Sequence, residues 1–291
     1  MTYRALIAAA LAGALLISGC GNESDDSPTG TPEEMTSEEA APPPNVLNVT
    51  LTEFAFQLEG QILGGQATAG DLLINFTNKG VQLHHAIIGK LEEGKTLKDV
   101  RNYLAKTRGE GKPPPWFDDK PLDMTLVSPG RTAGLILDAE EGTYVMLCFM
   151  PDAEGVPHFD HGMSQTFEIG PGEAPAVEPD VSIGFTEEGP DAPELSAGTS
   201  VVEVTNNADK PGEVFFVKLA EGAKLSDVGK WFEKGQKGKA PAEFLGGTHS
   251  YKPGETAKLT LTLEPGTYQI VATFEGKKGP EDIPVEFTVE G

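Results

Sequence analysis

Short runs in which apolar and polar residues alternate, bounded by Gly and Pro, recur along the chain from about residue 46 onward. Alternation with a period of two is typical of strands with one buried face, and short strands with Gly/Pro turns between them are typical of antiparallel sheets. The runs cover residues 72–77, 86–91, 133–139, 144–149, 201–205, 214–219, 257–263 and 268–274. The pattern predicts an all-β chain.

The order of these runs repeats within the chain. Phe76-Thr77-Asn78 recurs as Val204-Thr205-Asn206, and the segment 90–100 recurs with the same offset at 218–228. Gly142-Thr143-Tyr144 recurs as Gly266-Thr267-Tyr268. We therefore expect two copies of one domain, at residues 46–170 and 181–291, joined by the Pro- and acid-rich linker 171–180.

Each copy contains one segment with helical rather than strand periodicity. Apolar residues recur at helical spacing over 97–104 and again over 225–232, and Thr96 and Ser226 are the candidate N-caps. Trp116 and Trp231 are interpreted as packing residues. Short strands with one inserted helix predict two tandem Greek-key β-sandwiches, each with a short helix.

The first 20 residues do not fit this pattern. Arg4 precedes an apolar run that is too short to span a bilayer, and Ile17-Ser18-Gly19-Cys20 resembles a bacterial lipobox. Residues 1–20 are therefore predicted to be a lipoprotein signal peptide, cleaved before a lipid-modified Cys20. The alternative is an ordinary secretory signal with an incidental cysteine.

Residues 21–45 are rich in acids and prolines and have almost no large apolar side chains. Such a segment cannot bury enough surface to offset its ordering entropy, so we expect a disordered tether. With Cys20, it predicts an exported protein anchored to the outer face of the bacterial cell membrane, on the periplasmic or cell-surface side.

The formal net charge of the chain is −23. An acidic surface of this size disfavours binding to nucleic acid or direct adsorption to anionic lipid. It is compatible with a basic partner protein or with solubility alone.

Cys148 is the one cysteine that remains after Cys20. It has no disulfide partner, although the protein is expected to be exported. His158 and Met163 follow it in the same loop, and the adjacent pair His84 and His85 lies upstream. A thiolate, two imidazoles and a weak thioether are the ligand types of a type 1 copper site.

These residues resemble the ligand set of the cupredoxin family, although the ligand loop is longer than that of plastocyanin. The resemblance implies one type 1 copper ion, in the first domain only, bound by His84, Cys148, His158 and Met163. It also implies electron transfer to a redox partner protein, with no small-molecule substrate, through an exposed edge of the His158 ring. Val156, Pro157 and Phe159 are the candidate apolar rim of that port.

At two of the ligand positions the sequence offers a second candidate histidine. Neighbouring side chains of a strand point to opposite faces, so His84 or His85 can face the interior, but not both; we favour His84. His161 can replace His158 if the loop folds differently. The second copy acts as a control, because the repeat aligns Gly212 with His84 and Ala272 with Cys148.

Two other functions remain open from the sequence. One is a lipoprotein that handles or senses copper, and the other is a metal-free lipoprotein with a binding or structural role. An enzyme is not expected, because the five histidines of the chain are too few for the centres of a multicopper oxidase.

Overall fold

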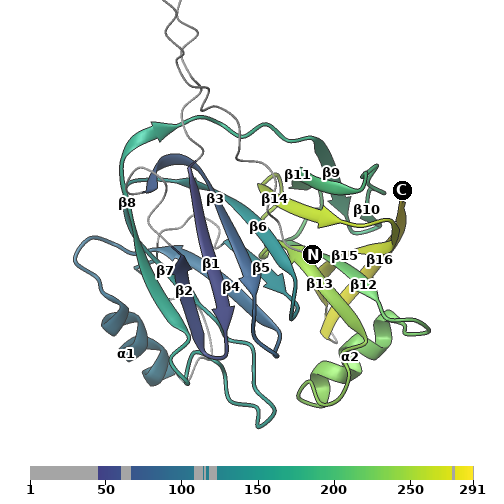
Figure 1. The fold of residues 1–291 in the computed structure, drawn as a ribbon, viewed down its shortest axis with the longest axis horizontal. Coiled ribbons are helices and arrows are strands. Elements are labelled where there is room, and N and C mark those ends of the chain that lie inside the picture. The colour runs from purple at the N-terminus through teal and green to yellow at the C-terminus, as the bar shows by residue number, and fades with distance from the viewer. Residues whose placement is uncertain are drawn as a thin grey trace, which may run out of the picture. The chain divides into compact units, whose positions relative to one another are not determined.

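The computed structural model describes residues 45–59, 67–107, 114, 116–117, 123–276 and 279–290 (Figure 1). The predicted signal peptide with Cys20, and all of the predicted tether except Asn45, lie outside the described residues. The described residues belong to one compact unit that spans Pro43–Gly291. In this part of the chain no helix is both long and apolar enough to cross a membrane.

Strands dominate the described residues of both halves, and one helix is seen in each. In chain order the elements are β1 (Val46–Thr52), β2 (Ala55–Glu59), β3 (Ala67–Asn78), β4 (His84–Lys90), α1 (Leu97–Thr107), β5 (Asp123–Val127), β6 (Thr132–Ala139), β7 (Gly142–Leu147), β8 (Ser164–Ala174), β9 (Val181–Thr186), β10 (Gly189–Pro190), β11 (Gly198–Asn206), β12 (Gly212–Leu219), α2 (Leu225–Glu233), β13 (Ala242–Gly247), β14 (Thr256–Leu263), β15 (Gly266–Gly276) and β16 (Gly279–Val289).

The first half forms a sandwich of two layers. In one layer β3 pairs in parallel with β1 and antiparallel with β6, while β2 pairs with β1. In the other layer β7 lies between β4 and β8, and β4 also pairs with β5. Leu72, Ile74 and Phe76 of β3 alternate with more exposed residues and are fully buried. The apolar residues of the predicted alternation therefore form the inward face of this strand.

The second half repeats the same connections. β11 pairs in parallel with β9 and antiparallel with β14, as β3 does with β1 and β6. β12 lies between β13 and β15, and β15 pairs with β16. The fold class predicted from the sequence is confirmed: the chain is all-β, with two tandem Greek-key sandwiches that each carry a short helix.

The two helices begin differently. The Thr96 hydroxyl accepts a hydrogen bond from the Asp99 N–H, and the Asp99 carboxylate accepts one from the Thr96 N–H, so Thr96 is the N-cap as predicted. The N-cap of α2 is Lys224, whose N–H donates to the Asp227 carboxylate. The prediction of Ser226 was wrong, because Asp227 supplies the side-chain acceptor and the helix starts before Ser226.

Backbone hydrogen bonds join the two halves at two places. β5 pairs with β13, and β6 pairs with β14 through Gly134 and Thr260. A Cβ on Gly134 would overlap the Thr260 hydroxyl, so this contact requires glycine. At the predicted linker 171–180, β8 runs on to Ala174, which pairs with Gly70. The first part of that segment is therefore strand.

Candidate metal centre

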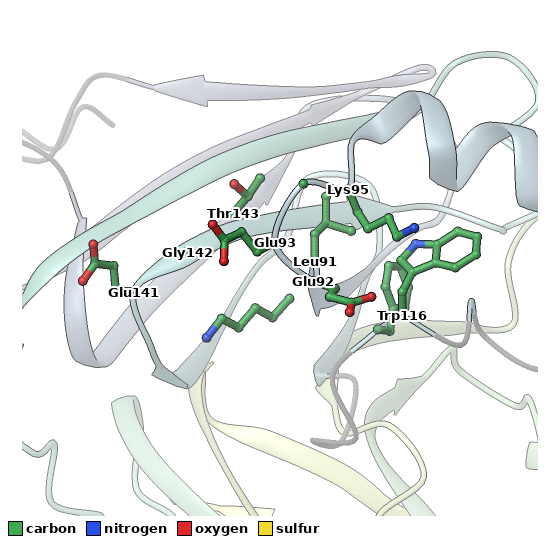
Figure 2. A pocket seen from close by; sticks show the side chains of 11 residues that line it. Leu91, Glu92, Glu93, Lys95, Trp116, Glu141, Gly142 and Thr143 are labelled. Atoms are coloured by element: carbon green, nitrogen blue, oxygen red, sulfur yellow. The ribbon is translucent and has the colours of Figure 1, made fainter.

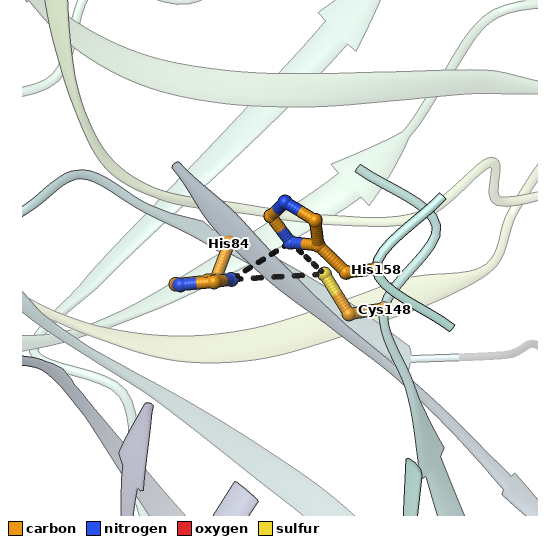
Figure 3. Close-up of side chains that lie close together, drawn as sticks. All are labelled: His84, Cys148 and His158. Carbon is orange, nitrogen blue, oxygen red and sulfur yellow. Dashed lines mark hydrogen bonds between the residues drawn. The ribbon is translucent and has the colours of Figure 1, made fainter. Parts of the chain in front are cut away.

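Three side chains from separate segments meet in the first half. His84 is the first residue of β4, Cys148 directly follows β7, and His158 lies in the loop between Cys148 and β8. Nδ1 of His84 lies 3.0 Å from Nδ1 of His158, and Sγ of Cys148 lies 4.0 Å and 3.5 Å from these two atoms. Figure 3 shows the three groups pointing toward one another.

The three atoms form a triangle of the size that a metal ion requires. The point equidistant from them lies about 2.1 Å from each, which is the length of a metal–nitrogen bond and about 0.2 Å less than that of a metal–thiolate bond. All three side chains have no solvent exposure. One sulfur and two imidazole nitrogens are the donors that copper accepts in a trigonal site. The residues present therefore fit a copper ion.

Burial sets the protonation states of this cluster. It raises the pKa of the Cys148 thiol to about 12. Burial, and next the charge of His158, lower the pKa of His84 to about 4, and burial also lowers the pKa of His158. Both imidazoles are thus neutral near pH 7 and can offer a lone pair, whereas the thiol must lose its proton to become a ligand.

Met163 lies beside this cluster. Its N–H donates to the His158 carbonyl, and its carbonyl accepts the N–H of Cys148. The residue is fully buried and belongs to the same apolar cluster as Cys148. The main chain therefore places Met163 next to Cys148 and His158, the two other ligands expected from this part of the chain.

The two alternative histidines lie outside the cluster. Nε2 of His85 accepts the N–H of Phe149, and its ring packs edge-on against the Phe149 ring, because the strand turns His85 to the face opposite His84. Nε2 of His161 lies 2.7 Å from the Asp152 carboxylate, and its ring stacks on Phe54. Both side chains have partners other than the thiol.

His158 differs from the sequence expectation in one respect. Its ring has no exposed edge, because Nε2 is hydrogen-bonded to Oε1 of Gln82 at 3.2 Å and the ring of Phe54 packs against it. Phe159, expected at an exposed rim, is 8 % exposed and packs on Phe149. Val156 and Pro157, the other two residues expected at the rim, are half-buried, and Val81, next to Gln82, is 82 % exposed.

Asn78, to which the sequence alone assigned no role, organises the turn before His84. The Asn78 side chain donates to the carbonyls of Gln82 and Val127 and accepts the N–H of Gly80. These bonds fix the turn that leads into β4. A signal was available, because Asn78 belongs to the repeated tripeptide and its counterpart Asn206 makes equivalent bonds.

In the second half aromatic rings fill the space that the ligands occupy in the first. A Cβ on Gly212, the counterpart of His84, would overlap the rings of Phe274 and Phe185. These rings pack against each other with centroids 5.8 Å apart, and Ala272, the counterpart of Cys148, is fully buried. The same scaffold thus has an apolar core where the first half has the donor cluster.

A cleft of about 830 Å³ lies elsewhere in the first half, between the end of β4, the start of α1 and the β6–β7 turn (Figure 2). Its lining includes Lys90, Glu92, Glu93 and Trp116. The indole of Trp116 packs edge-on against Tyr103, in line with the expected packing role. None of the expected copper ligands lines this cleft.

No protein-family model matches the sequence, and neither does any curated protein. Among solved structures the chain is similar to an auracyanin from the photosynthetic bacterium Roseiflexus castenholzii, at 22 % identity over 45 % of this chain and 98 % of that chain, with a TM-score of 0.30. It is also similar to auracyanin A, a blue copper protein from Chloroflexus aurantiacus, at 20 % identity over 42 % and 98 % of the two chains (TM-score 0.28). A multicopper oxidase covers more of this chain, 84 %, at 16 % identity and a TM-score of 0.23, and is itself covered to 88 %. Likenesses at these TM-scores do not assign a function, and the case for a metal centre rests on the geometry of the side chains.

Proposed function

We propose that the chain is a type 1 copper protein that transfers electrons. The observation that carries this proposal is the convergence of His84 Nδ1, His158 Nδ1 and Cys148 Sγ around one point at metal-bond distance. Copper bound there would supply a one-electron couple. The protein would supply the ligand geometry, and Met163 would add a weak thioether ligand.

The surroundings of the cluster favour electron transfer over bond-making chemistry. The three donors have no solvent exposure, and Gln82 and Phe54 cover the His158 ring, so a substrate has no direct approach. Catalytic metal sites instead keep a coordination position open. We therefore propose a carrier and not an enzyme.

The same enclosure disfavours the copper-handling alternative. A protein that passes copper on needs ligands that another molecule can reach, whereas the Cys148 thiol is fully buried and its pKa is raised to about 12 by that burial. Strands β4 and β7, which carry or adjoin two of the ligands, are paired with each other from Ile87 to Lys90 of β4. Such a frame suits one fixed ligand geometry in both oxidation states.

The proposed setting follows from the sequence. Lipid on Cys20 and the acidic tether would hold the protein at the outer face of the bacterial cell membrane. The partner would be another redox protein. With a net charge of −23 on this chain, a partner with a basic docking surface would associate faster than an acidic one.

The test is the absorption and EPR spectra of the full-length protein in detergent, loaded with Cu(II), beside Cys148→Ser. We expect an intense thiolate-to-copper charge-transfer band in the visible region that the substitution abolishes. Weak absorption that is identical in both proteins would rule out a type 1 site. It would leave a structural or ligand-binding lipoprotein.

A further inference from the structure

Two residues other than glycine have a left-handed backbone in the described part of the chain; one packs on His158 and the other is hydrogen-bonded to the ligand loop. They are Phe54, with φ 65°, and Gln236, with φ 58°. A side chain disfavours this conformation, so surrounding contacts must hold it in place, and such residues gather at functional sites. Phe54 packs on the His158 ring, whereas Gln236 belongs to the second half of the chain.

Gln236 reaches from the end of helix α2 to the ligand loop of the first half. Its N–H donates to the Trp231 carbonyl and so closes the last turn of α2. Its side-chain Nε2 donates to the carbonyl of Pro151 at 3.0 Å. Pro151 lies between Cys148 and His158, so the second half holds the segment that carries two of the donors.

The contact is close to the ligands along the chain. Pro151 forms a β-bridge with Pro157, and the adjacent Met150 accepts the N–H of His158 at 2.8 Å. A displacement of the Pro151 carbonyl would therefore be passed to His158 through one bridge and one hydrogen bond.

The third donor is also tied to the second half. His84 is the register partner of Val127, and Val127 pairs with Leu245 of β13. The neighbouring Ser128 exchanges two hydrogen bonds with Phe244, from its N–H to the Phe244 carbonyl and from the Phe244 N–H to its hydroxyl. Contacts from the second half thus reach both segments that carry the histidines.

A groove of about 450 Å³ marks the place where the halves meet over the site. Phe54, Gln82 and Pro151 line it from the first half, and Trp231 and Gln236 from the second. Gln82 is the residue that bonds to His158, so the groove brings Trp231 and Gln236 of the second half next to a side chain that contacts a ligand.

From these contacts we infer that the metal-free second half positions the copper ligands, with Gln236 as its positioning residue. The copper readouts of this inference rest on the proposed function. The inference gives the second sandwich a role, since its own core has no donor cluster.

Two substitutions separate this role from a role in stability. Gln236→Gly suits the left-handed backbone but removes the amide, so relief of strain opposes loss of the hydrogen bond and the thermal midpoint should change little. Gln236→Glu keeps the length of the side chain but places an acceptor against the Pro151 carbonyl. Lys234→Gly, at an exposed position of the same helix end, is the matched control.

The first readout needs no copper. In full-length metal-free protein, the amides of Asp152, Gly155 and His158 should exchange with solvent about fivefold faster in both Gln236 variants, the factor expected for one lost hydrogen bond, and at the wild-type rate in Lys234→Gly. The second readout is the copper-loaded protein, where both Gln236 variants should shift the reduction potential and the charge-transfer band.

Unchanged exchange in both Gln236 variants would overturn the inference and leave Gln236 as the end of a helix only. Faster exchange in all three variants would also overturn it, because a loosened helix end would then explain the effect. A wild-type protein without a thiolate band would refute the proposed function instead, and the exchange rates would still decide whether Gln236 holds the loop.

Discussion

His84 and His158 face each other through their Nδ1 atoms, 3.0 Å apart, with the Cys148 sulfur within 4.0 Å of both. Nε2 of His84 is buried and has no hydrogen-bond partner among the described residues. Without a metal ion, the two rings can share one proton between their Nδ1 atoms. With a metal ion, both Nδ1 lone pairs would point at it, and Nε2 of His84 would carry the proton of that ring.

The adjacent histidines allow a direct test of ligand identity. His84→Gln should abolish the charge-transfer band, because it removes one of the three converging donors. His85→Gln should retain the band, since His85 bonds to the Phe149 N–H on the other face of the strand. Absorption spectra of the two copper-loaded variants decide the matter. Loss of the band in His85→Gln alone would reverse the assignment.

Copper should stabilise the fold through the same three donors. A ligand that binds only the native state, at a free concentration 100 times its Kd, raises the free energy of unfolding by about 2.7 kcal/mol. We therefore expect a higher thermal midpoint with copper and a return to the metal-free value after chelation. The midpoint of Cys148→Ser should respond much less. An equal response would place the stabilising metal elsewhere.

Asn78 and Asn206 form a matched pair for testing the turn that leads to His84. Each side chain makes three hydrogen bonds to the backbone in its own half. Alanine at either position should lower the free energy of unfolding by about 2–3 kcal/mol, because buried backbone groups lose partners. Asn78→Ala alone should change the copper EPR spectrum. Equal spectra in the two variants would show that the turn does not position His84.

The repeat and the alternation of apolar residues sufficed to predict both sandwiches, because each strand buries one face. The buried residues then recur at every second position, as Leu72, Ile74 and Phe76 do. The choice of His84 over His85 followed from the same alternation. Local sequence thus determined which residues face the core.

Contacts between distant segments could not be predicted in this way. The hydrogen bond from Gln236 to Pro151 joins residues of different halves, and the sequence around either residue contains no pattern that predicts it. The burial of His158 under Gln82 also depends on how the β3–β4 turn folds over the ligand loop. Gln82 lies in that turn, before β4 begins at His84, so the period of two of a strand does not predict where its side chain points.

The environment of Glu213, in the second half, predicts that the stability of the protein depends on pH. Burial, and next the charge of Asp282, raise the pKa of Glu213 to about 7. The folded state then keeps a proton that the unfolded chain loses above its ordinary pKa of 4.5, so stability falls as pH rises from about 4.5 to about 7 and levels off above that.

Glu213→Gln removes this group and should stabilise the protein by about 1–3 kcal/mol near pH 8, with little effect near pH 4.5. Urea unfolding at the two pH values measures the difference. Glu264→Gln, at an exposed position, is the control and should show no such pH-dependent gain. A constant difference between Glu213→Gln and wild type at both pH values would contradict the raised pKa.

Gly134 and Thr260 test whether the junction between the halves is part of the folded core. A Cβ on Gly134 would overlap the Thr260 hydroxyl where β6 pairs with β14. Gly134→Ala should therefore cost about 1–3 kcal/mol of unfolding free energy, a typical cost of overpacking. In the double variant, Thr260→Ala should recover part of this loss, whereas Thr260→Ala alone should not stabilise the protein. A double-mutant cycle, measured by urea unfolding, gives the coupling between the two positions. Additive effects would mean that the added methyl group at position 134 does not meet the Thr260 side chain in solution.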